Sequence, residues 1–318
     1  MQDPPTTLRI IQELAAGWLS IPAIIGSHMR AASYFLNCGT EAQKEHYLPL
    51  LAKGKLIASH AYNELAVHDS KVLGTTLRHD SGNWILNGSK HWVTNALDSD
   101  FIIIIARLVD KESSHRLVAV LLKRERYDEL QMIDLVRPGI KGVSLCEVTC
   151  NQIKIDPDRE TIGGITVDVT PVLKLASAAK YLNFAARSLG CAQAIVSHCA
   201  KLLKLRNASS LHPVALHRFG EMQSKLYACE SMFERALQNY SSDQQDEIAA
   251  MSAKVFCGQE LQNIIRHAIN LLGGAGYASQ DSFLERCYRD AASLQVSGTT
   301  LDVVCTKLAA NYLENYHV

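Results

Sequence analysis

The sequence of 318 residues predicts an α+β protein in which helical segments precede and follow a central β unit along the chain. Apolar residues recur at helical spacing up to about residue 55, where the pattern changes to strand-like alternation broken by turn residues. Long amphipathic stretches return after residue 168. This order predicts three parts: an N-terminal helical segment (1–55), an antiparallel, barrel-like β-domain (56–165) and a C-terminal four-helix bundle (166–318).

The first part contains two helix starts. Thr6 or Thr7 can cap a helix whose apolar positions follow at helical spacing. A second helix begins after Thr40, a plausible N-cap with Gln43 three residues later, which is the pattern of a capping box. We expect this helix to run as far as Gly54.

The second part has the pattern of strands joined by turns. Between residues 77 and 94, two strand-like runs are broken by turn residues at 80–83 and at Asn87-Gly88. Asn-Gly between alternating apolar residues is a strong hairpin signal, so we expect a turn there. Further strands are expected at residues 101–107, 116–122, 142–148 and 152–155.

The third part contains four long amphipathic stretches with breaks at Pro213, at 241–243 and at Gly273-Gly274. Helices of this length, joined by short connections, predict an antiparallel four-helix bundle. The stretches cover about residues 170–206, 215–240, 243–276 and 280–315.

Composition excludes several classes of protein. The 32 basic and 32 acidic side chains balance, which argues against a nucleic-acid or membrane-surface binder. The longest apolar run, 101–106, is far shorter than the roughly 20 residues of a membrane span, and no secretory signal is visible. Nine scattered cysteines without a Cys-x-x-Cys pair predict reduced, mostly buried thiols in a cytoplasmic protein.

The segment Arg289–Thr300 resembles the part of acyl-CoA dehydrogenases that carries the catalytic base, and five local motifs resemble the same family. These motifs lie at Gly39–Gly54, Asn87–Asn95, Ser188–Gln193, Ala268–Tyr277 and Glu285–Asp290. Each motif alone is weak, but the five occur in the family's order and are spread over nearly the whole chain. The resemblance implies the family's architecture, an FAD cofactor between the β-domain and the bundle, and a pocket for a fatty acyl thioester on the flavin.

The resemblance assigns cofactor contacts to particular residues. Trp92 and Thr94 correspond to the indole and hydroxyl that lie beside the isoalloxazine, where a ring face and a hydrogen-bond donor suit the flavin. Filling a β-core is the alternative role for this pair. Asn63 and Thr299 join the same cofactor shell.

Other cofactor contacts fall in the bundle. Arg206 matches an arginine that reaches a partner subunit's FAD phosphates, although an exposed structural arginine fits the sequence equally. Asn270, Gly273 and Gly274 correspond to the segment near the adenosine half of a neighbour's FAD. A simple helix break is the alternative role of the two glycines.

The catalytic position departs from the family. After the Arg289-Asp290 pair, the family has Glu-Gly-Thr, whereas this chain has Ser297 before Gly298. A serine hydroxyl is a poor acceptor for the α-proton that dehydrogenation removes. Some relatives place the glutamate on the first bundle helix, a position that corresponds here to Lys180. A buried neutral lysine can serve as a base, and an exposed charged lysine is the alternative.

The residues predicted to contact the substrate also differ from the family pattern. The resemblance places His68, Tyr181 and Gly298 at the acyl substrate, but the loop around His68 is altered, and Tyr181 replaces an arginine. The family also has about two further helices before the position of Thr6, so this chain resembles an N-terminally short member.

Two functions remain open from the sequence. The first is an FAD-dependent oxidoreductase acting on an acyl group carried by CoA or a carrier protein, in a homodimer or homotetramer. The second is a degenerate, non-catalytic family member that serves as a subunit or scaffold. No histidine spacing predicts a metal site, and no Gly-x-Ser-x-Gly elbow predicts a serine hydrolase.

Overall fold

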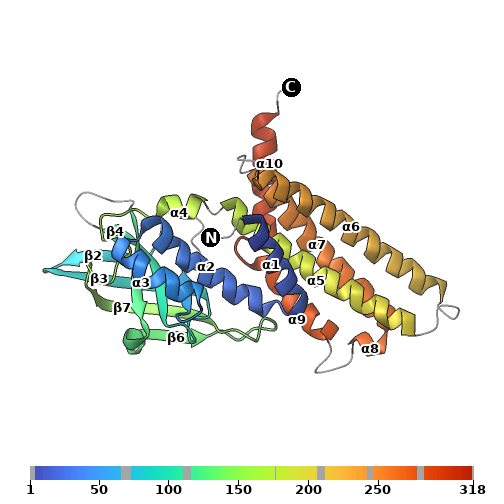
Figure 1. Cartoon of the computed structure of the whole chain (residues 1–318), viewed down its shortest axis with the longest axis horizontal. Helices are drawn as coiled ribbons and strands as arrows, with labels where there is room; N and C mark the ends of the chain where they lie inside the picture. The colour runs from blue at the N-terminus through green and yellow to red at the C-terminus, as the bar shows by residue number, and fades with distance from the viewer. Residues whose placement is uncertain are drawn as a thin grey trace. The chain divides into compact units, whose positions relative to one another are not determined.

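The computed structural model describes residues 4–65, 73–109, 116–175, 177–205, 212–241, 246–277 and 283–316. The chain forms two compact units. Unit 1 comprises Met1–Pro22, Arg137–Lys141 and Ala176–Val318, and is mainly the bundle; unit 2 comprises Ala23–Val136 and Gly142–Leu175, and contains the sheet. The α+β class and the order of helices, sheet and helices are confirmed (Figure 1).

The N-terminal segment forms the three helices α1 (Pro4–Gly17), α2 (Ser20–Cys38) and α3 (Glu41–Ala52). Helix α1 begins at Pro4, slightly before the expected threonine cap, because the fixed φ of proline suits a first helical turn. The capping box is confirmed: Gln43 N donates to Thr40 Oγ1 over 3.2 Å, and Thr40 N donates to Gln43 Oε1 over 3.1 Å. Helix α3 ends two residues before Gly54, which has φ of 63°.

The sheet has seven strands, in the order β1-β4-β2-β3-β7-β6, with β5 on β4. Their bounds are β1 Ala58–Ala61, β2 Thr76–Asp80, β3 Asn83–Thr94, β4 Phe101–Val109, β5 Leu117–Lys123, β6 Leu130–Asp134 and β7 Leu145–Ile155. The prediction of an all-antiparallel unit is wrong, because β1 and β2 both pair parallel to β4. Strand direction depends on which distant segments pair, and periodicity carries no information about that choice.

Strands β4 and β5 are buried on both faces, which explains their continuous apolar runs. Ile102 and Ile104 belong to one core cluster, whereas Ile103 and Ile105 belong to a second one that also contains Phe35 of α2. Helices α2 and α3 therefore cover one face of the sheet within unit 2.

The hairpin expected at Asn87-Gly88 does not form. Gly88 lies inside β3 at a shift of register, with φ of 138°, and a Cβ there would lie 2.4 Å from Thr75 Cα. The side chain of Asn87 accepts a hydrogen bond from Gln152 N over 2.8 Å. Gln152 has φ of 54° within β7, so the two strands expected at 142–148 and 152–155 are one bulged strand. Strands β1 and β6 have no counterpart among the expected strands.

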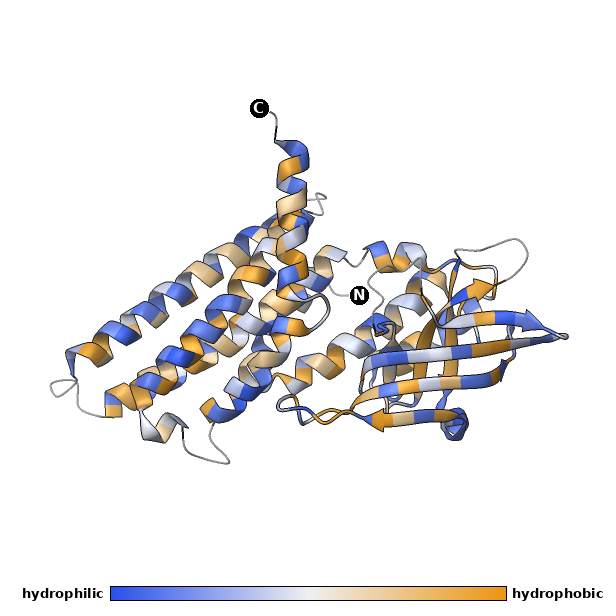
Figure 2. Cartoon of the chain, turned by 180° about the vertical axis from the view of Figure 1, so that it is seen from behind, coloured by the Kyte–Doolittle hydropathy of each residue, from blue (hydrophilic) through white to orange (hydrophobic). Residues whose placement is uncertain are grey.

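The C-terminal helices are α4 (Thr170–Leu175), α5 (Ser177–Leu205), α6 (Pro213–Ser241), α7 (Glu247–Leu272), α8 (Gly274–Tyr277), α9 (Phe283–Val296) and α10 (Leu301–Asn315). Helices α5, α6 and α7 run side by side, with hydrophilic and hydrophobic residues interleaved along each one (Figures 1 and 2). The single helix expected at 280–315 is wrong, because the chain breaks between Val296 and Leu301. That break contains the predicted catalytic position.

The Arg289-Asp290 pair has a structural role in unit 1. Asp290 is 2% exposed and accepts hydrogen bonds from Ile140 N over 2.6 Å and from Trp18 Nε1 over 3.1 Å. Arg289 donates to Pro138 O over 3.0 Å. The pair therefore fastens the 137–141 segment and the end of α1 to α9.

None of the described helices is long and apolar enough to cross a membrane. Seven of the nine cysteines are buried, all nine are free, and only Cys305 is exposed. The expectation that most of the thiols are buried is therefore confirmed.

Candidate functional site

The predicted catalytic position lies in a tight turn between α9 and α10. Ser297 N donates to Ser293 O and Thr299 N donates to Ser297 O, each over 2.9 Å. Gly298 has φ of 73°, and a Cβ there would lie 2.3 Å from Phe184 Cε2. Glycine is therefore required at this position by both backbone conformation and space.

A buried lysine holds this turn. Lys254 of α7 is 1% exposed, and its Nζ donates to Ser297 O over 3.0 Å and also to Thr299 O. The same nitrogen lies 4.6 Å from the centroid of the Phe184 ring. Burial and the neighbouring charge of Lys180 lower the pKa of Lys254 to about 7. The two carbonyls and the ring face occupy the surroundings of its amine, so Lys254 positions the turn.

Sequence reasoning missed Lys254. The available signal is its place on the apolar face of α7, among Ala250, Met251, Ala253 and Cys257, which are all buried. A lysine on a buried face needs specific acceptors. Nothing in the local pattern shows that these acceptors lie in a turn more than 40 residues later in the sequence.

Lys180 also reaches the turn. Its Nζ donates to Thr299 Oγ1 over 3.3 Å and lies 4.6 Å from the centroid of the Tyr181 ring. Tyr181 is fully buried, and its hydroxyl has no hydrogen-bond partner among the described residues. The structure therefore brings together seven residues, which we call the turn cluster: Lys180, Tyr181, Phe184, Lys254, Ser297, Gly298 and Thr299.

The turn cluster contains two lysines and no acidic side chain. Residues 297–300 include no acid, and no ion pair joins Lys254 to a carboxylate in the described parts of the chain. Asp290 lies two turns earlier on α9, but its oxygens already hold Trp18 and Ile140. Burial raises the pKa of Asp290. Within the described ranges, the two lysines are therefore the side-chain nitrogen bases at the turn.

In unit 2, Trp92 has an unusual conformation. It lies in β3 with φ of 60°, next to a shift of register against β7, and is 53% exposed. A bulky residue at positive φ is strained, and such strain concentrates at binding sites. Trp92 is therefore not a core residue, and its exposed indole offers a face on which a planar ring fits.

Hydrogen bonds hold the backbone near Trp92 in place. Thr94 O accepts hydrogen bonds from Ser59 Oγ over 2.8 Å and from Ser27 Oγ over 3.3 Å. Asn63 is exposed, and its carbonyl accepts a hydrogen bond from His91 N over 2.8 Å. Asn63 is therefore hydrogen-bonded to β3 at His91, the residue next to Trp92.

A buried ion pair braces the chain around Asn63. Lys90 Nζ lies 2.7 Å from Glu64 Oε1, and the side-chain exposures are 0% and 6%. Lys90 also donates to Tyr62 O over 3.1 Å, and Glu64 accepts from Gly74 N and Thr75 N over 2.6 and 3.0 Å. Burial acts to raise the pKa of Glu64, but the Lys90 ammonium and the other donors outweigh it and lower that pKa.

Asn270, Gly273 and Gly274 lie at the end of α7 and the start of α8. Gly273 has φ of 61°, and its N donates to Ile269 O over 2.9 Å, so the helix break expected at the two glycines is present. A Cβ on Gly274 would meet nothing within 4 Å. Asn270 is exposed and lines a cavity of about 190 Å³ with five other residues: His212, Val214, Ala215, Arg218 and Leu271. Arg206 and His68 lie outside the described residues.

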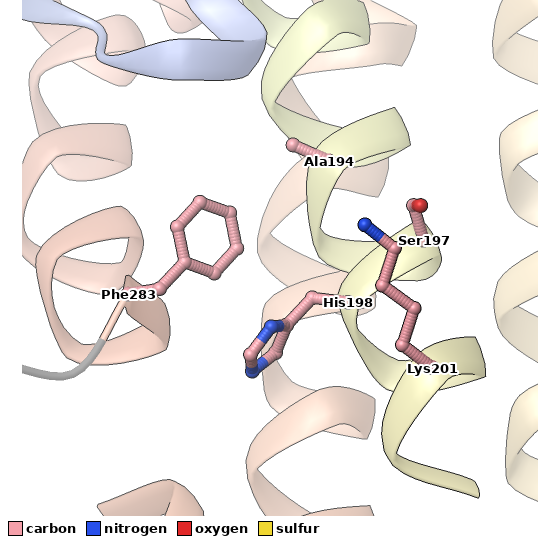
Figure 3. A pocket seen from close by; sticks show the side chains of 5 residues that line it. All are labelled: Ala194, Ser197, His198, Lys201 and Phe283. Atoms are coloured by element: carbon pink, nitrogen blue, oxygen red, sulfur yellow. The ribbon is translucent and has the colours of Figure 1, made fainter. Parts of the chain in front are cut away.

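A larger cavity, of about 320 Å³, lies on α5 and the start of α9 (Figure 3). The rings of His198 and Phe283 lie close together there, with centroids 5.1 Å apart and planes tilted by 48°. Its remaining lining residues are Ala194, Ser197 and Lys201. It contains none of the predicted site residues, so the turn cluster and this cavity are distinct.

Comparisons with known proteins cover most of the chain. The N-terminal, middle and C-terminal domain families of acyl-CoA dehydrogenase match residues 2–55, 66–153 and 179–313. The chain is 26% identical to a 3-(aryl)acrylate reductase of Clostridium sporogenes, over 88% of this chain and 75% of that protein. It is 23% identical to a glutaryl-CoA dehydrogenase of Desulfococcus multivorans, over 89% and 74% of the two chains.

Solved structures share the fold. A glutaryl-coenzyme A dehydrogenase in complex with glutaryl-CoA superimposes with a TM-score of 0.86 at 21% identity, covering 98% of this chain and 80% of that chain. The prolyl acyl carrier protein oxidase AnaB gives a TM-score of 0.81 at 24% identity, covering 97% and 83%. With all three domain families matched in order, this chain belongs to the acyl-CoA dehydrogenase family.

Proposed function

We propose that this protein is an FAD-dependent oxidoreductase that acts on an acyl thioester of CoA or of a carrier protein. Family membership supports the reaction class, and the relatives include enzymes named for acyl-CoA and for acyl carrier protein substrates. The observation that carries the proposal is the exposed, strained Trp92 on β3. An indole held at positive φ and left uncovered fits a flavin ring better than a structural role.

The residues on β3 and beside it suit a flavin ring. Trp92, Thr94 and Asn63 provide a ring face and polar groups on β3 and beside it. In the bundle, the family resemblance assigns Thr299 to this flavin and Asn270, Gly273 and Gly274 to the FAD of a neighbouring subunit, and Arg206 stays a prediction from the sequence. When bound, FAD supplies the acceptor for the hydride that leaves the β-carbon.

The turn cluster supplies the proton chemistry. Ser297 stands where the family has its carboxylate, and its hydroxyl is too weak a base to remove a carbon-bound proton. Lys180 is the nitrogen base on the expected face, with its Nζ at Thr299 Oγ1. In its neutral form it accepts the α-proton at Nζ. Lys254 keeps Ser297 and Thr299 in place through their carbonyls.

A non-catalytic subunit is the second candidate, favoured by the replacement of the family's acid with Ser297. Two observations separate the candidates. The enzyme loses its flavin absorbance when an acyl thioester is added without oxygen, whereas a flavin-bound but non-catalytic subunit does not. A colourless purified protein would contradict the enzyme and favour an empty scaffold.

Replacing Trp92 by alanine should weaken flavin binding by roughly tenfold to a hundredfold, because a stacked aromatic face contributes about 1.5–3 kcal/mol. Thr94→Ala should have a smaller effect in the same direction. The measurement is the ratio of flavin to protein after gel filtration. Trp84→Ala is the matched control, since Trp84 lies on the same strand but packs on the core. Unchanged flavin content in both test variants would exclude this site.

We also propose a homodimer or homotetramer. The end of α10 presents exposed aromatic and aliphatic side chains, with Tyr312, Leu313 and Tyr316 at 66%, 71% and 58% exposure. An apolar group of this size on one helix end indicates a covering partner, and a second copy is the partner the family resemblance implies. Light scattering at micromolar concentration should give at least twice 35.1 kDa, and Leu313→Asp should lower it. A monomeric mass for the unmodified protein would contradict the assembly.

A further inference from the structure

Unit 1 contains a second buried cation that the proposed reaction does not use. Arg187 of α5 is 9% exposed, and its Nη2 donates to Pro22 O over 2.7 Å. Its guanidinium carbon lies 5.1 Å from the centroid of the Phe184 ring. Its Nε is buried without a hydrogen-bond partner in the described parts of the chain.

No carboxylate in the described parts of the chain forms an ion pair with this arginine. Burial lowers its pKa to about 10, with no charged neighbour contributing, so the guanidinium remains charged at neutral pH. Buried charges in proteins are ordinarily paired, since an unpaired one is costly. One carbonyl and one ring face leave most of its five donors unused.

Arg187 lies in line with the turn cluster. Lys180, Phe184 and Arg187 are spaced i, i+4 and i+7, which places them on one face of α5. Phe184 packs against Gly298 of the turn, and Lys254 lies over the same ring as Arg187. Seven residues of helix span about 10 Å. An acyl chain that runs from the turn along this face of α5 would pass Phe184 and reach Arg187.

We infer that Arg187 binds a carboxylate at the distal end of the substrate's acyl group, so that the protein selects ω-carboxyacyl thioesters over unsubstituted ones. The inference rests on the proposed function. A planar guanidinium is suited to a carboxylate, which it can hold through two parallel hydrogen bonds. The buried Nε, which has no hydrogen-bond partner among the described residues, is a donor that such a carboxylate would satisfy. The competing explanation is that Arg187 only supports the chain at Pro22.

Calorimetric titration of the purified flavoprotein with glutaryl-CoA and pentanoyl-CoA tests the inference, because the two acyl chains have equal length. We expect glutaryl-CoA to bind at least about tenfold more tightly, the effect of one charge-assisted contact. Arg187→Met should abolish this preference while leaving pentanoyl-CoA affinity within about threefold. Arg187→Lys should retain part of it. Lys201→Met, on an exposed position of α5, is the matched control and should leave the ratio unchanged.

Equal affinities in the unmodified protein, or a preference that survives in Arg187→Met, overturn the inference and leave the proposed function intact. If Arg187→Met does not fold, the ratio in the unmodified protein and in Arg187→Lys decides. Failure of both thioesters to bind overturns the proposed function itself, and the inference with it. A loss of thermal stability in Arg187→Met with an unchanged ratio would assign Arg187 to support of Pro22 alone.

Discussion

Lys90→Met is expected to destabilise the sheet unit by about 3–5 kcal/mol, because it leaves the buried carboxylate of Glu64 without its counter-ion. The side chains of both partners are almost fully buried, and Glu64 also anchors two backbone amides, Gly74 N and Thr75 N. Urea unfolding followed by circular dichroism measures the loss. Lys154→Met is the control, since Lys154 is an exposed lysine on β7 of the same sheet.

The free energy of unfolding measured at acidic pH provides a second test of this pair. The folded pKa of Glu64 lies below its ordinary value of 4.5, so the pair's contribution is present above that value and is lost as pH falls through the folded pKa. Lys90→Met should flatten this part of the profile. The double variant Lys90→Met with Glu64→Gln should recover part of the stability, because no charge then remains buried. A cost below about 1 kcal/mol for Lys90→Met would contradict the assigned role.

Ser297→Glu is expected to increase thioester-dependent flavin bleaching by about 10² or more, because general-base assistance is typically worth 10² to 10⁴ in rate. A carboxylate at this turn lies near the amines of Lys180 and Lys254, and nearby positive charge favours its ionised form. The measurement is the anaerobic decay of flavin absorbance after addition of a saturated acyl-CoA. Ser297→Gln is the matched control, with similar size and no base.

The unmodified protein should bleach only weakly, and Lys180→Met should reduce that residual rate further. Strong bleaching that Lys180→Met leaves unchanged would contradict the role given to Lys180. No bleaching in either the unmodified protein or Ser297→Glu, with FAD still bound, would favour the non-catalytic subunit.

Local signals in the sequence predict most of the helices and the family correctly. The capping box at Thr40 and Gln43 involves residues three apart, so the sequence contains everything needed to predict it. The five motifs and the 289–300 segment identify the family, and that segment shows that Ser297 stands where the family has its acid. The family resemblance also indicates Asn63 and Trp92 as cofactor contacts, and both assignments stay predictions.

Most of the errors concern contacts between distant segments. Asn87-Gly88 has the local character of a hairpin turn, but pairing with Gln152 and close approach to Thr75 make it a bulge. The parallel direction of β1 and β2 against β4 depends on partners that local periodicity does not specify. The break at 297–300 does carry local signals, Gly298 at positive φ and Thr300 as the N-cap of α10, although the lysine that holds the turn lies outside it.

The sequence by itself determined the family, the order of helices and sheet, and the absence of an acid at the expected catalytic position. The family resemblance already indicated Lys180 near that position, and only the tertiary structure showed that Lys254 lies there as well. Lys254 is one lysine among many in the sequence, and its function at the turn follows from two carbonyls 43 and 45 residues away. The physical reason is burial: away from water, a charged group must find its partners within the fold, and chain topology decides which groups are within reach.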